Sequence, residues 1–226
     1  MNKVFYFSAT GHCREIATIF AERLGAPVHE IGGGGVDSAQ TAVVVFPVHC
    51  QSLPEPVRCW LPKLRAENVV LIAAYGRMHP GTALHEAAGL VSGRVIAGAN
   101  LPTGHSYLGD EVPFDPGALE PILRRIEHPS EADIPKGERQ LFARLAPALR
   151  SRVGVKISRS NSCDGCGNCT RRCPVGAMEK GLPGKGCIRC LRCVHECPRR
   201  ALSFSLHPLL RLYLRKPRRA ETILYL

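Results

Sequence analysis

The 226-residue sequence lacks any long apolar run and any recognisable export signal. No stretch reaches the roughly 18 apolar residues that a membrane-spanning helix needs. The longest apolar runs, such as Val43–Pro47 and Val69–Tyr75, have the length of strands. The N-terminus has no small-residue cleavage site after an apolar core, as a signal peptide would. We therefore expect a cytoplasmic protein with no membrane span.

Familiar catalytic and nucleic-acid-binding motifs are missing as well. Nothing in the sequence resembles a catalytic triad, a Walker loop or a nicotinamide-binding fingerprint. Any substrate-level partner should therefore be external, and whether the chain is itself an enzyme stays open. No DNA-reading motif is present, so we expect no nucleic-acid partner.

Cysteine is abundant, and its distribution follows the distribution of charge. In a chain without an export signal, eleven cysteines favour metal or redox chemistry over disulfides. Cys13, Cys50 and Cys59 are scattered, whereas the other eight lie between positions 163 and 197. Residues 1–130 carry 10 Lys/Arg against 12 Asp/Glu, a net charge of −2, and the rest carry 20 against 7, a net charge of +13. The basic half is therefore the half with the clustered cysteines.

Residues 1–128 alternate between strand-like and helix-like patterns, which predicts an α/β domain. The expected strands are Lys3–Phe7, Val28–Ile31, Ala42–Val48, Val69–Tyr75 and Arg94–Ala97. The expected helices are Glu15–Leu24, Pro56–Leu64, Ala83–Val91 and Gly117–Ile126. Five such units predict a doubly wound five-stranded parallel sheet with right-handed crossovers.

The remaining chain divides into three further segments. Residues 129–155 are expected to form a linker with an amphipathic helix within Glu138–Arg152. Residues 156–205 contain an internal repeat, in which each clustered cysteine recurs 24 positions later. Residues 206–226 form a basic, leucine-rich tail. We expect this tail to pack on the protein; the alternative is contact with an anionic membrane surface.

The clustered cysteines form two runs with the C-x2-C-x2-C-x3-C-P spacing of bacterial ferredoxins. The first run is Cys163, Cys166, Cys169 and Cys173, and the second is Cys187, Cys190, Cys193 and Cys197. Three cysteines on one tight loop can bind three corners of a [4Fe–4S] cubane, and the fourth is carried away to the neighbouring cluster. One cluster should therefore take the first three cysteines with Cys197, and the other Cys187, Cys190 and Cys193 with Cys173. A pair of zinc sites is the alternative.

Arginines crowd both runs, and the two loops differ in composition. The first loop carries Gly165 and Gly167, and the second carries Ile188, Arg189, Leu191 and Arg192 instead. Positive charge near a cluster favours its reduced form and should raise its potential. The same arginines are equally compatible with a solvated basic surface.

The loop Ser8-Ala9-Thr10-Gly11-His12-Cys13 follows the first expected strand and opens a helix. Amides at a helix N-terminus, aided by small hydroxyl residues and a glycine, bind phosphate in doubly wound folds. A Ser/Thr-rich helix cap is the alternative. Further loops follow the third, fourth and fifth expected strands, at the sheet edge where ligands bind in this fold. They are Pro47-Val48-His49-Cys50, Tyr75-Gly76-Arg77 and Thr103-Gly104-His105-Ser106-Tyr107.

Taken together, these motifs resemble fusions of a flavodoxin-like domain to a two-cluster ferredoxin, found as iron–sulfur flavoproteins. The resemblance rests on Phe5–Gly11, the loops at Pro47, Tyr75 and Gly104, and both cysteine runs. It implies a flavodoxin-like sheet of strand order 2-1-3-4-5, a small α+β ferredoxin domain, and FMN with two [4Fe–4S] clusters. The implied FMN-binding residues are Ser8, Ala9, Thr10, Gly11, His12, Cys13, Pro47, Val48, His49, Cys50, Tyr75, Gly76, Arg77, Gly104 and His105. The family usually has a hydroxyl at Cys13 and often an aromatic residue followed by glycine at His49 and Cys50.

The resemblance implies electron transfer between FMN and the clusters, which couples one- and two-electron steps. An acidic redox protein of ferredoxin or flavodoxin type is the expected partner of the basic half. A reductase of a small molecule, bound near His49, Cys50, His105 and Tyr107, is the alternative, and a redox sensor is a third. Cys59 is expected to be a core thiol, whereas a role for Cys50 stays open, and His105 could bond either the flavin or the backbone.

Overall fold

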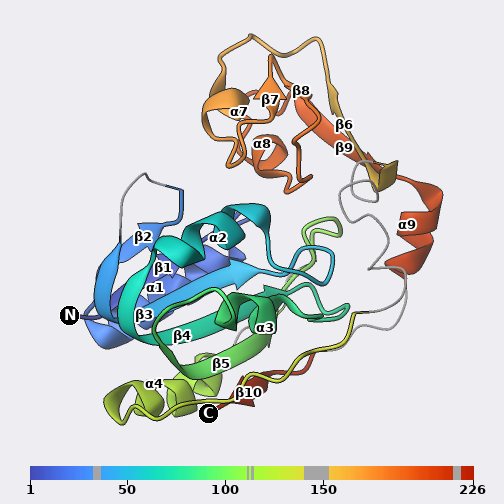
Figure 1. The fold of residues 1–226 in the computed structure, drawn as a ribbon. Helices are drawn as coiled ribbons and strands as arrows, with labels where there is room; N and C mark the ends of the chain where they lie inside the picture. The colour runs from blue at the N-terminus through green and yellow to red at the C-terminus, as the bar shows by residue number, and fades with distance from the viewer. Residues whose placement is uncertain (33–36, 111, 113–114, 140–152, 216–219) are drawn as a thin grey trace. The chain divides into compact units, whose positions relative to one another are not determined.

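The structure, a computed structural model, describes residues 1–32, 37–110, 112, 115–139, 153–215 and 220–226. The chain divides into two compact units (Figure 1). The first contains Met1–Gln140 together with Arg218–Leu226, and the second contains Leu141–Pro217. The helix expected within Glu138–Arg152 falls almost wholly outside the described residues.

The first unit is built around one sheet. Its strands are β1 (Lys3–Tyr6), β2 (Val28–Glu30), β3 (Ser38–Pro47), β4 (Arg65–Tyr75), β5 (Arg94–Pro102) and β10 (Ile223–Tyr225). Its helices are α1 (His12–Leu24), α2 (Glu55–Trp60), α3 (Ala83–Ala88) and α4 (Glu120–Glu127), with short 3-10 turns η1 (Leu61–Lys63) and η2 (Pro116–Leu119). The strands lie in the order β10-β5-β4-β3-β1-β2. The prediction of an α/β fold with a mostly parallel central sheet is confirmed.

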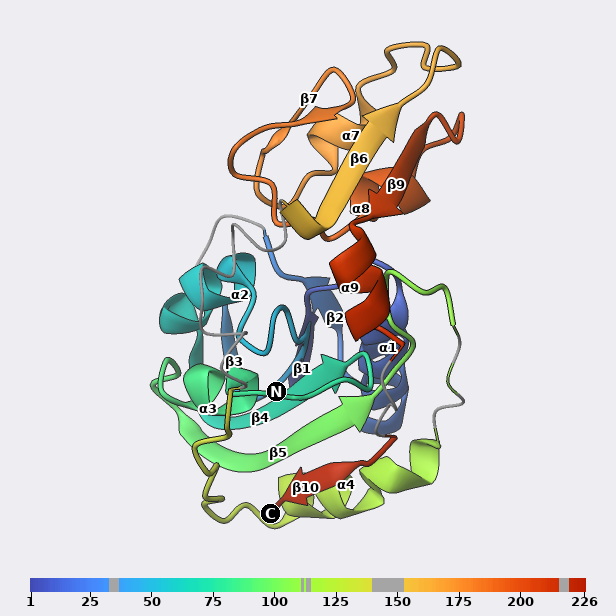
Figure 2. The same ribbon diagram turned by 90° about the vertical axis from the view of Figure 1, so that its right-hand side faces the viewer.

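The sheet has six strands, so the expected five-stranded parallel sheet is wrong in one respect. Strand β10, from the end of the chain, pairs antiparallel with β5 (Figure 2). The pairing covers the edge of β5 that would otherwise present unpaired amides and carbonyls. The tail therefore packs on the protein over β10, as expected.

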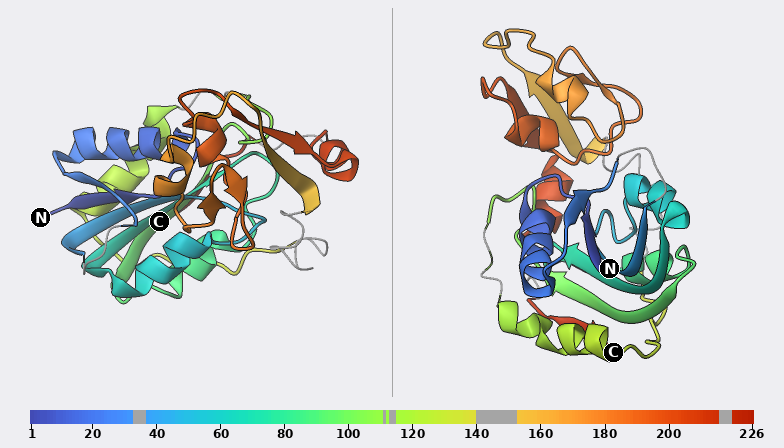
Figure 3. Two further views of the ribbon diagram at one scale, coloured as in Figure 1. Left: turned by 90° about the horizontal axis from the view of Figure 1, so that it is seen from above. Right: turned by 90° about the vertical axis from the view of Figure 1, so that its left-hand side faces the viewer.

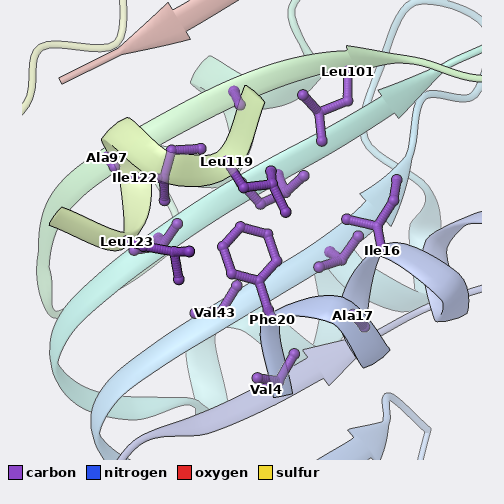
Figure 4. Packing of buried hydrophobic residues seen from close by; sticks show 14 of the residues in the cluster. Val4, Ile16, Ala17, Phe20, Val43, Ala97, Leu101, Leu119, Ile122 and Leu123 are labelled. Carbon is purple, nitrogen blue, oxygen red and sulfur yellow. The ribbon is translucent and has the colours of Figure 1, made fainter. Parts of the chain in front are cut away.

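Helices cover both faces of this sheet. Figure 3 shows α1 and α4 on one face and α2 and α3 on the other. On the first of these faces Phe20 of α1 meets Leu119 and Leu123 above the strands (Figure 4). The central strands β3 and β4 are buried over most of their length, which explains their continuous apolar sequences.

The side chain of Tyr75, at the end of β4, fastens the C-terminal segment to the sheet. Its ring is 2% exposed, and its hydroxyl donates to the Glu221 carbonyl over 2.6 Å. The same hydroxyl accepts from the Glu221 amide over 3.2 Å. The hydroxyl of Tyr75 is thus engaged with the backbone before β10, and the assignment of Tyr75 to the cofactor-binding loops stays a prediction.

The second unit consists of short elements around the cysteine runs. They are β6 (Val155–Arg159), α7 (Asn168–Arg171), β7 (Met178–Glu179), β8 (Leu182–Pro183), α8 (Arg192–His195), β9 (Leu202–Leu206) and α9 (Pro208–Tyr213). Strands β6 and β9 pair antiparallel, as do β7 and β8. Helices α7 and α8 begin 24 residues apart, at the repeat distance of the cysteines.

We expect Tyr75→Phe to loosen the C-terminal strand. The variant removes two hydrogen bonds at a buried hydroxyl, and each bond stabilises the fold by about 1 kcal/mol. The melting temperature should fall by several degrees, and hydrogen exchange at residues 221–225 should accelerate. Tyr225→Phe is the matched control, because it removes a hydroxyl from a partly exposed residue of β10 itself. Equal exchange in both variants would contradict the role of Tyr75.

Candidate functional site

Four cysteines from both runs line one cavity in the second unit. The cavity measures about 280 Å³, and its wall includes Cys163, Cys166 and Cys169 of the first run with Cys197 of the second. The rest of the wall includes Gly165 and apolar residues that follow Cys197 in the chain. It also includes the basic residues Arg159, Lys180 and Arg199. The cavity thus brings together the three closely spaced cysteines of the first run and the last cysteine of the second run, as the ferredoxin spacing predicts.

The remaining four cysteines form a second group. Burial raises the pKa of Cys190 to about 11, and the charges of Cys173 and Cys187 also raise the pKa of this thiol. Burial also raises the pKa of Cys193 to about 12. Repulsion from the neighbouring Cys190, Cys187, Cys173 and Cys169 acts in the same direction. The Cys173 thiol is therefore close enough to the second run to affect the pKa values of Cys190 and Cys193. A thiol must lose its proton before it binds iron, so assembly at these buried cysteines would release protons.

The fourth cysteine of each run has the same surroundings. The Ala177 amide donates to the Cys173 sulfur over 3.2 Å, and the Ala201 amide donates to the Cys197 sulfur over 3.3 Å. Amide donors of this kind stabilise thiolate ligands and tune a bound cluster. Among the described residues, no three His, Cys, Asp or Glu side chains are placed to hold a single metal ion. Four cysteines around a cavity of about 280 Å³ are the donor set and the room that fit a four-iron cluster.

The two cysteine loops share a backbone conformation although their residues differ. Gly165 and Gly167 have φ angles of 75° and 72°, and the residues 24 positions later have 57° at Arg189 and 64° at Leu191. This left-handed conformation costs residues other than glycine roughly 1–2 kcal/mol. Leu191 is fully buried, and the burial of its side chain offsets this cost.

In the first unit, the loop between β1 and α1 is a short turn at the N-terminus of the helix. The Ser8 hydroxyl accepts from the Gly11 amide over 3.1 Å, and Gly11 has a φ angle of 105°. Helix α1 begins at His12, so its first amides lie at this loop. Ala9 and Thr10 are partly exposed there.

Cys13 does not belong to this loop, and its assignment to the phosphate site is corrected. Its side chain is 3% exposed and packs in the core with Ile16, Ala17 and Phe20. Burial raises the pKa of the thiol far above its ordinary value. The second residue of α1 faces the sheet, so a cysteine there fills the core rather than donating to a ligand.

The loops after β4 and β5 meet next to the β1 loop. A Cβ at Gly76 would lie 2.7 Å from the His105 ring, and one at Gly104 would lie 3.1 Å from the His12 ring and 1.9 Å from the Asp110 carbonyl. Only glycine allows these approaches. Four predicted site residues, His12, Gly76, Gly104 and His105, are thus brought together from three loops.

Asp110 joins these loops, although nothing in the sequence singled it out. Its carboxylate forms an ion pair with Arg77 and accepts from the His105 amide over 2.8 Å. The His105 ring accepts from the Tyr107 amide over 3.2 Å, which is the backbone partner considered above. A carboxylate five residues beyond a histidine gives no sequence signal, because its partner Arg77 lies on a different loop.

The loop after β3 forms a tight turn. The amides and carbonyls of His49 and Ser52 bond each other over 3.0 and 2.9 Å. Cys50 and Gln51, between them, both have positive φ angles, as a type I′ turn requires. Pro47 and Val48 are partly buried, and Cys50 is exposed.

His49 is partly buried in this turn. Its ring lies edge-on to Phe7 at a centroid distance of 6.5 Å. Burial lowers the pKa of His49 to about 4, so the imidazole is neutral at physiological pH. A neutral imidazole on this turn is compatible with a planar ligand beside it. In this structure the ring contacts Phe7.

A carboxylate on α3 holds the same turn. Glu86 accepts from the Ser52 hydroxyl over 2.8 Å and forms an ion pair with Arg58. Burial opposes ionisation of Glu86, but hydrogen bonds from Thr82, Ser52 and Arg58 hold the pKa of its carboxyl below the ordinary value. Cys59, on the neighbouring α2, is exposed at 3.4 Å from Glu55, so its prediction as a core thiol is wrong.

Comparison with known proteins supports the iron–sulfur part of these predictions. The 4Fe-4S binding domain family matches residues 159–179, which include the whole first cysteine run. The chain therefore carries an iron–sulfur binding segment of the kind that transfers electrons. A search of curated proteins found no match.

A comparison of structures found a candidate flavoprotein from Bacteroides uniformis ATCC 8492. It is 16% identical, with a TM-score of 0.38, over 46% of this chain and 91% of that one. No helix in the described part of the chain is both long and apolar enough to cross a membrane.

We expect the fourth cysteine of each run to serve the other run's site. Cys197→Ser should remove the cluster that belongs to Cys163, Cys166 and Cys169, and Cys173→Ser the one that belongs to the second run. Each variant should lose about half of the iron and sulfide, and electron paramagnetic resonance should show which reduced-cluster signal remains. The same lost signal in Cys197→Ser and in Cys187→Ser would show that each run closes its own cluster and would contradict the prediction.

Proposed function

We propose that the protein is an electron-transfer iron–sulfur flavoprotein with two [4Fe–4S] clusters and one FMN. The observation that carries this proposal is the cavity lined by Cys163, Cys166 and Cys169 with Cys197. When bound, FMN exchanges electrons singly or in pairs and each cluster exchanges one at a time, so the set couples one- and two-electron chemistry. The first cluster would be held by this group of cysteines and the second by Cys187, Cys190, Cys193 and Cys173.

The proposed FMN site is the edge of the sheet where the β1, β3, β4 and β5 loops lie. The amides of Ala9, Thr10 and His12, in the loop and at the first residue of α1, would bind the phosphate, since the Gly11 amide already donates to Ser8. Gly76 and Gly104 leave room for close approach of the backbone, and Asp110 keeps the loops that carry them together. The side chains of Cys13 and Tyr75 have other roles and are left out of the proposed site.

Cofactor analysis of anaerobically purified protein tests this proposal. Two four-iron cubanes require about eight iron and eight sulfide per chain, and we expect one FMN. Gly76→Ala should lower the FMN content and leave iron and sulfide unchanged, because the new methyl group displaces His105. Gly109→Asn is the control, since a Cβ there has no neighbour within 4 Å and asparagine tolerates its φ of 62°.

Several results would contradict parts of the proposal. Stoichiometric zinc without sulfide would exclude the clusters, and four iron per chain would leave only one of them. FAD in place of FMN, or protein without flavin after reconstitution, would exclude the FMN site.

We further propose that the partner is an acidic redox protein that docks on the second unit. Leu141–Pro217 contains 16 Lys/Arg against 3 Asp/Glu. Arg171, Lys180, Lys185 and Arg200 are exposed, whereas Arg172 and Arg199 are paired with Glu196 and Asp164. A field of one sign steers a partner of opposite charge and accelerates encounter.

Reduction by an acidic ferredoxin or flavodoxin should therefore slow steeply as salt rises, because the field is screened over roughly 8 Å at physiological ionic strength. Reduction by a small neutral donor should not. Neutralising Arg171, Lys185 and Arg200 to glutamine should flatten the salt dependence measured by stopped flow. The matched control neutralises Arg14, Lys63 and Arg124, which are exposed in the first unit. A rate with no salt dependence for any acidic donor would reject this partner.

A further inference from the structure

The two cysteine loops have one backbone shape but opposite electrostatics. The residues that occupy equivalent positions, 24 apart, are Asp164 and Ile188, Gly165 and Arg189, Gly167 and Leu191, and Asn168 and Arg192. Their φ angles agree within about 20° at the glycine positions. The first loop thus contains one carboxylate and no cation, and the second contains two cations and no carboxylate.

Arg192 is the cation that lies deepest in the second loop. It opens α8 between the proposed ligands Cys190 and Cys193 and is 6% exposed. The equivalent residue of the first loop, Asn168, is neutral and donates its side-chain amide to the Glu196 carbonyl over 2.8 Å.

The arginines near the first group of cysteines are placed differently. Arg171 donates to the Cys166 carbonyl over 2.9 Å from an exposed position. Arg199 is 64% exposed and is paired with Asp164 at 2.9 Å. Water, salt and the paired carboxylate weaken the field of such exposed cations. A buried cation acts through a medium of low dielectric constant, where its field is much stronger.

We propose that Arg192 sets the reduction potential of the cluster held by Cys187, Cys190, Cys193 and Cys173. This inference rests on the proposed function, since it requires that cluster. Reduction adds one electron to a group that is already negative, and burial of Cys187 and Cys193 opposes the added charge. A buried guanidinium, carried by a residue between Cys190 and Cys193, offsets this cost and favours the reduced form. The two clusters are therefore unequal, and Arg192 is a tuning residue rather than a ligand.

Redox titration of the holoprotein, followed by electron paramagnetic resonance, tests the proposal. Arg192→Asn gives the second loop the residue of the first, and it should lower the potential of the second cluster. We expect at least a tenfold change in its reduced-to-oxidised ratio at a fixed potential, which is about 59 mV for one electron. The first cluster should change less, and Arg192→Lys should retain most of the wild-type potential. The signals are assigned with Cys173→Ser and Cys197→Ser.

The reciprocal variant keeps the proposal testable if Arg192→Asn does not assemble its cluster. Asn168→Arg places a cation at the equivalent position of the first loop and should raise the potential of the first cluster. Arg171→Gln and Arg199→Gln are the exposed controls, and each should shift the potentials much less. Equal shifts in exposed and buried variants, or no change in either Arg192→Asn or Asn168→Arg, would overturn the proposal. Fewer than eight iron in the wild-type protein would instead reject the proposed function.

Discussion

The second unit depends on one constraint: the three closely spaced cysteines of a run need a fourth cysteine from elsewhere to complete a group of four. Cys197 of the second run meets this need in the cavity lined by Cys163, Cys166 and Cys169, and the proposed two-cluster arrangement assigns Cys173 to the second run in the same way. The pairing of β6 with β9 joins the segments before and after the two runs. Little apolar surface is needed elsewhere in this unit, because ligand bonds can replace a large core.

Because β10 belongs to the first unit, the second unit is an insertion within the chain of the first. Because β10 pairs with β5 and Tyr75 binds Glu221, the first unit holds chain both before and after Leu141–Pro217.

Much of this arrangement could be predicted from the sequence, and the failures have physical causes. The cysteine spacing predicted the group that lines the cavity, because three closely spaced ligands and one distant ligand leave few ways to fold. The buried strands were found because their apolar runs are continuous, as in β4. Strand β10 was missed because three residues carry too little pattern, and pairing with β5 is a long-range choice. Cys13 was misplaced because a loop motif does not tell which face of the following helix a residue occupies.

The contacts that hold the site loops together were beyond sequence reasoning for a similar reason. Asp110 and Glu86 act through partners that are far away in the chain, Arg77 in one case and Arg58 in the other. The sequence also did not indicate where the Tyr75 side chain lies, because the residue before a loop can turn its backbone to the loop and its side chain away. Tyr75 does both, since its carbonyl accepts from Thr103 while its hydroxyl binds Glu221.

The two cysteine loops of the second unit differ in sequence although they share one backbone conformation, and this difference has a physical explanation. Arg189 and Leu191 occupy left-handed positions where glycine would be easier, at a cost of roughly 1–2 kcal/mol each. Ligand bonds to a structural metal can contribute about 10 kcal/mol or more to folding, so such a cost is small beside them. Once ligand bonds fix the backbone of a loop, its side chains are free to serve electrostatics instead of conformation. A glycine-rich loop and an arginine-bearing loop can then share one shape while presenting different fields to what they bind.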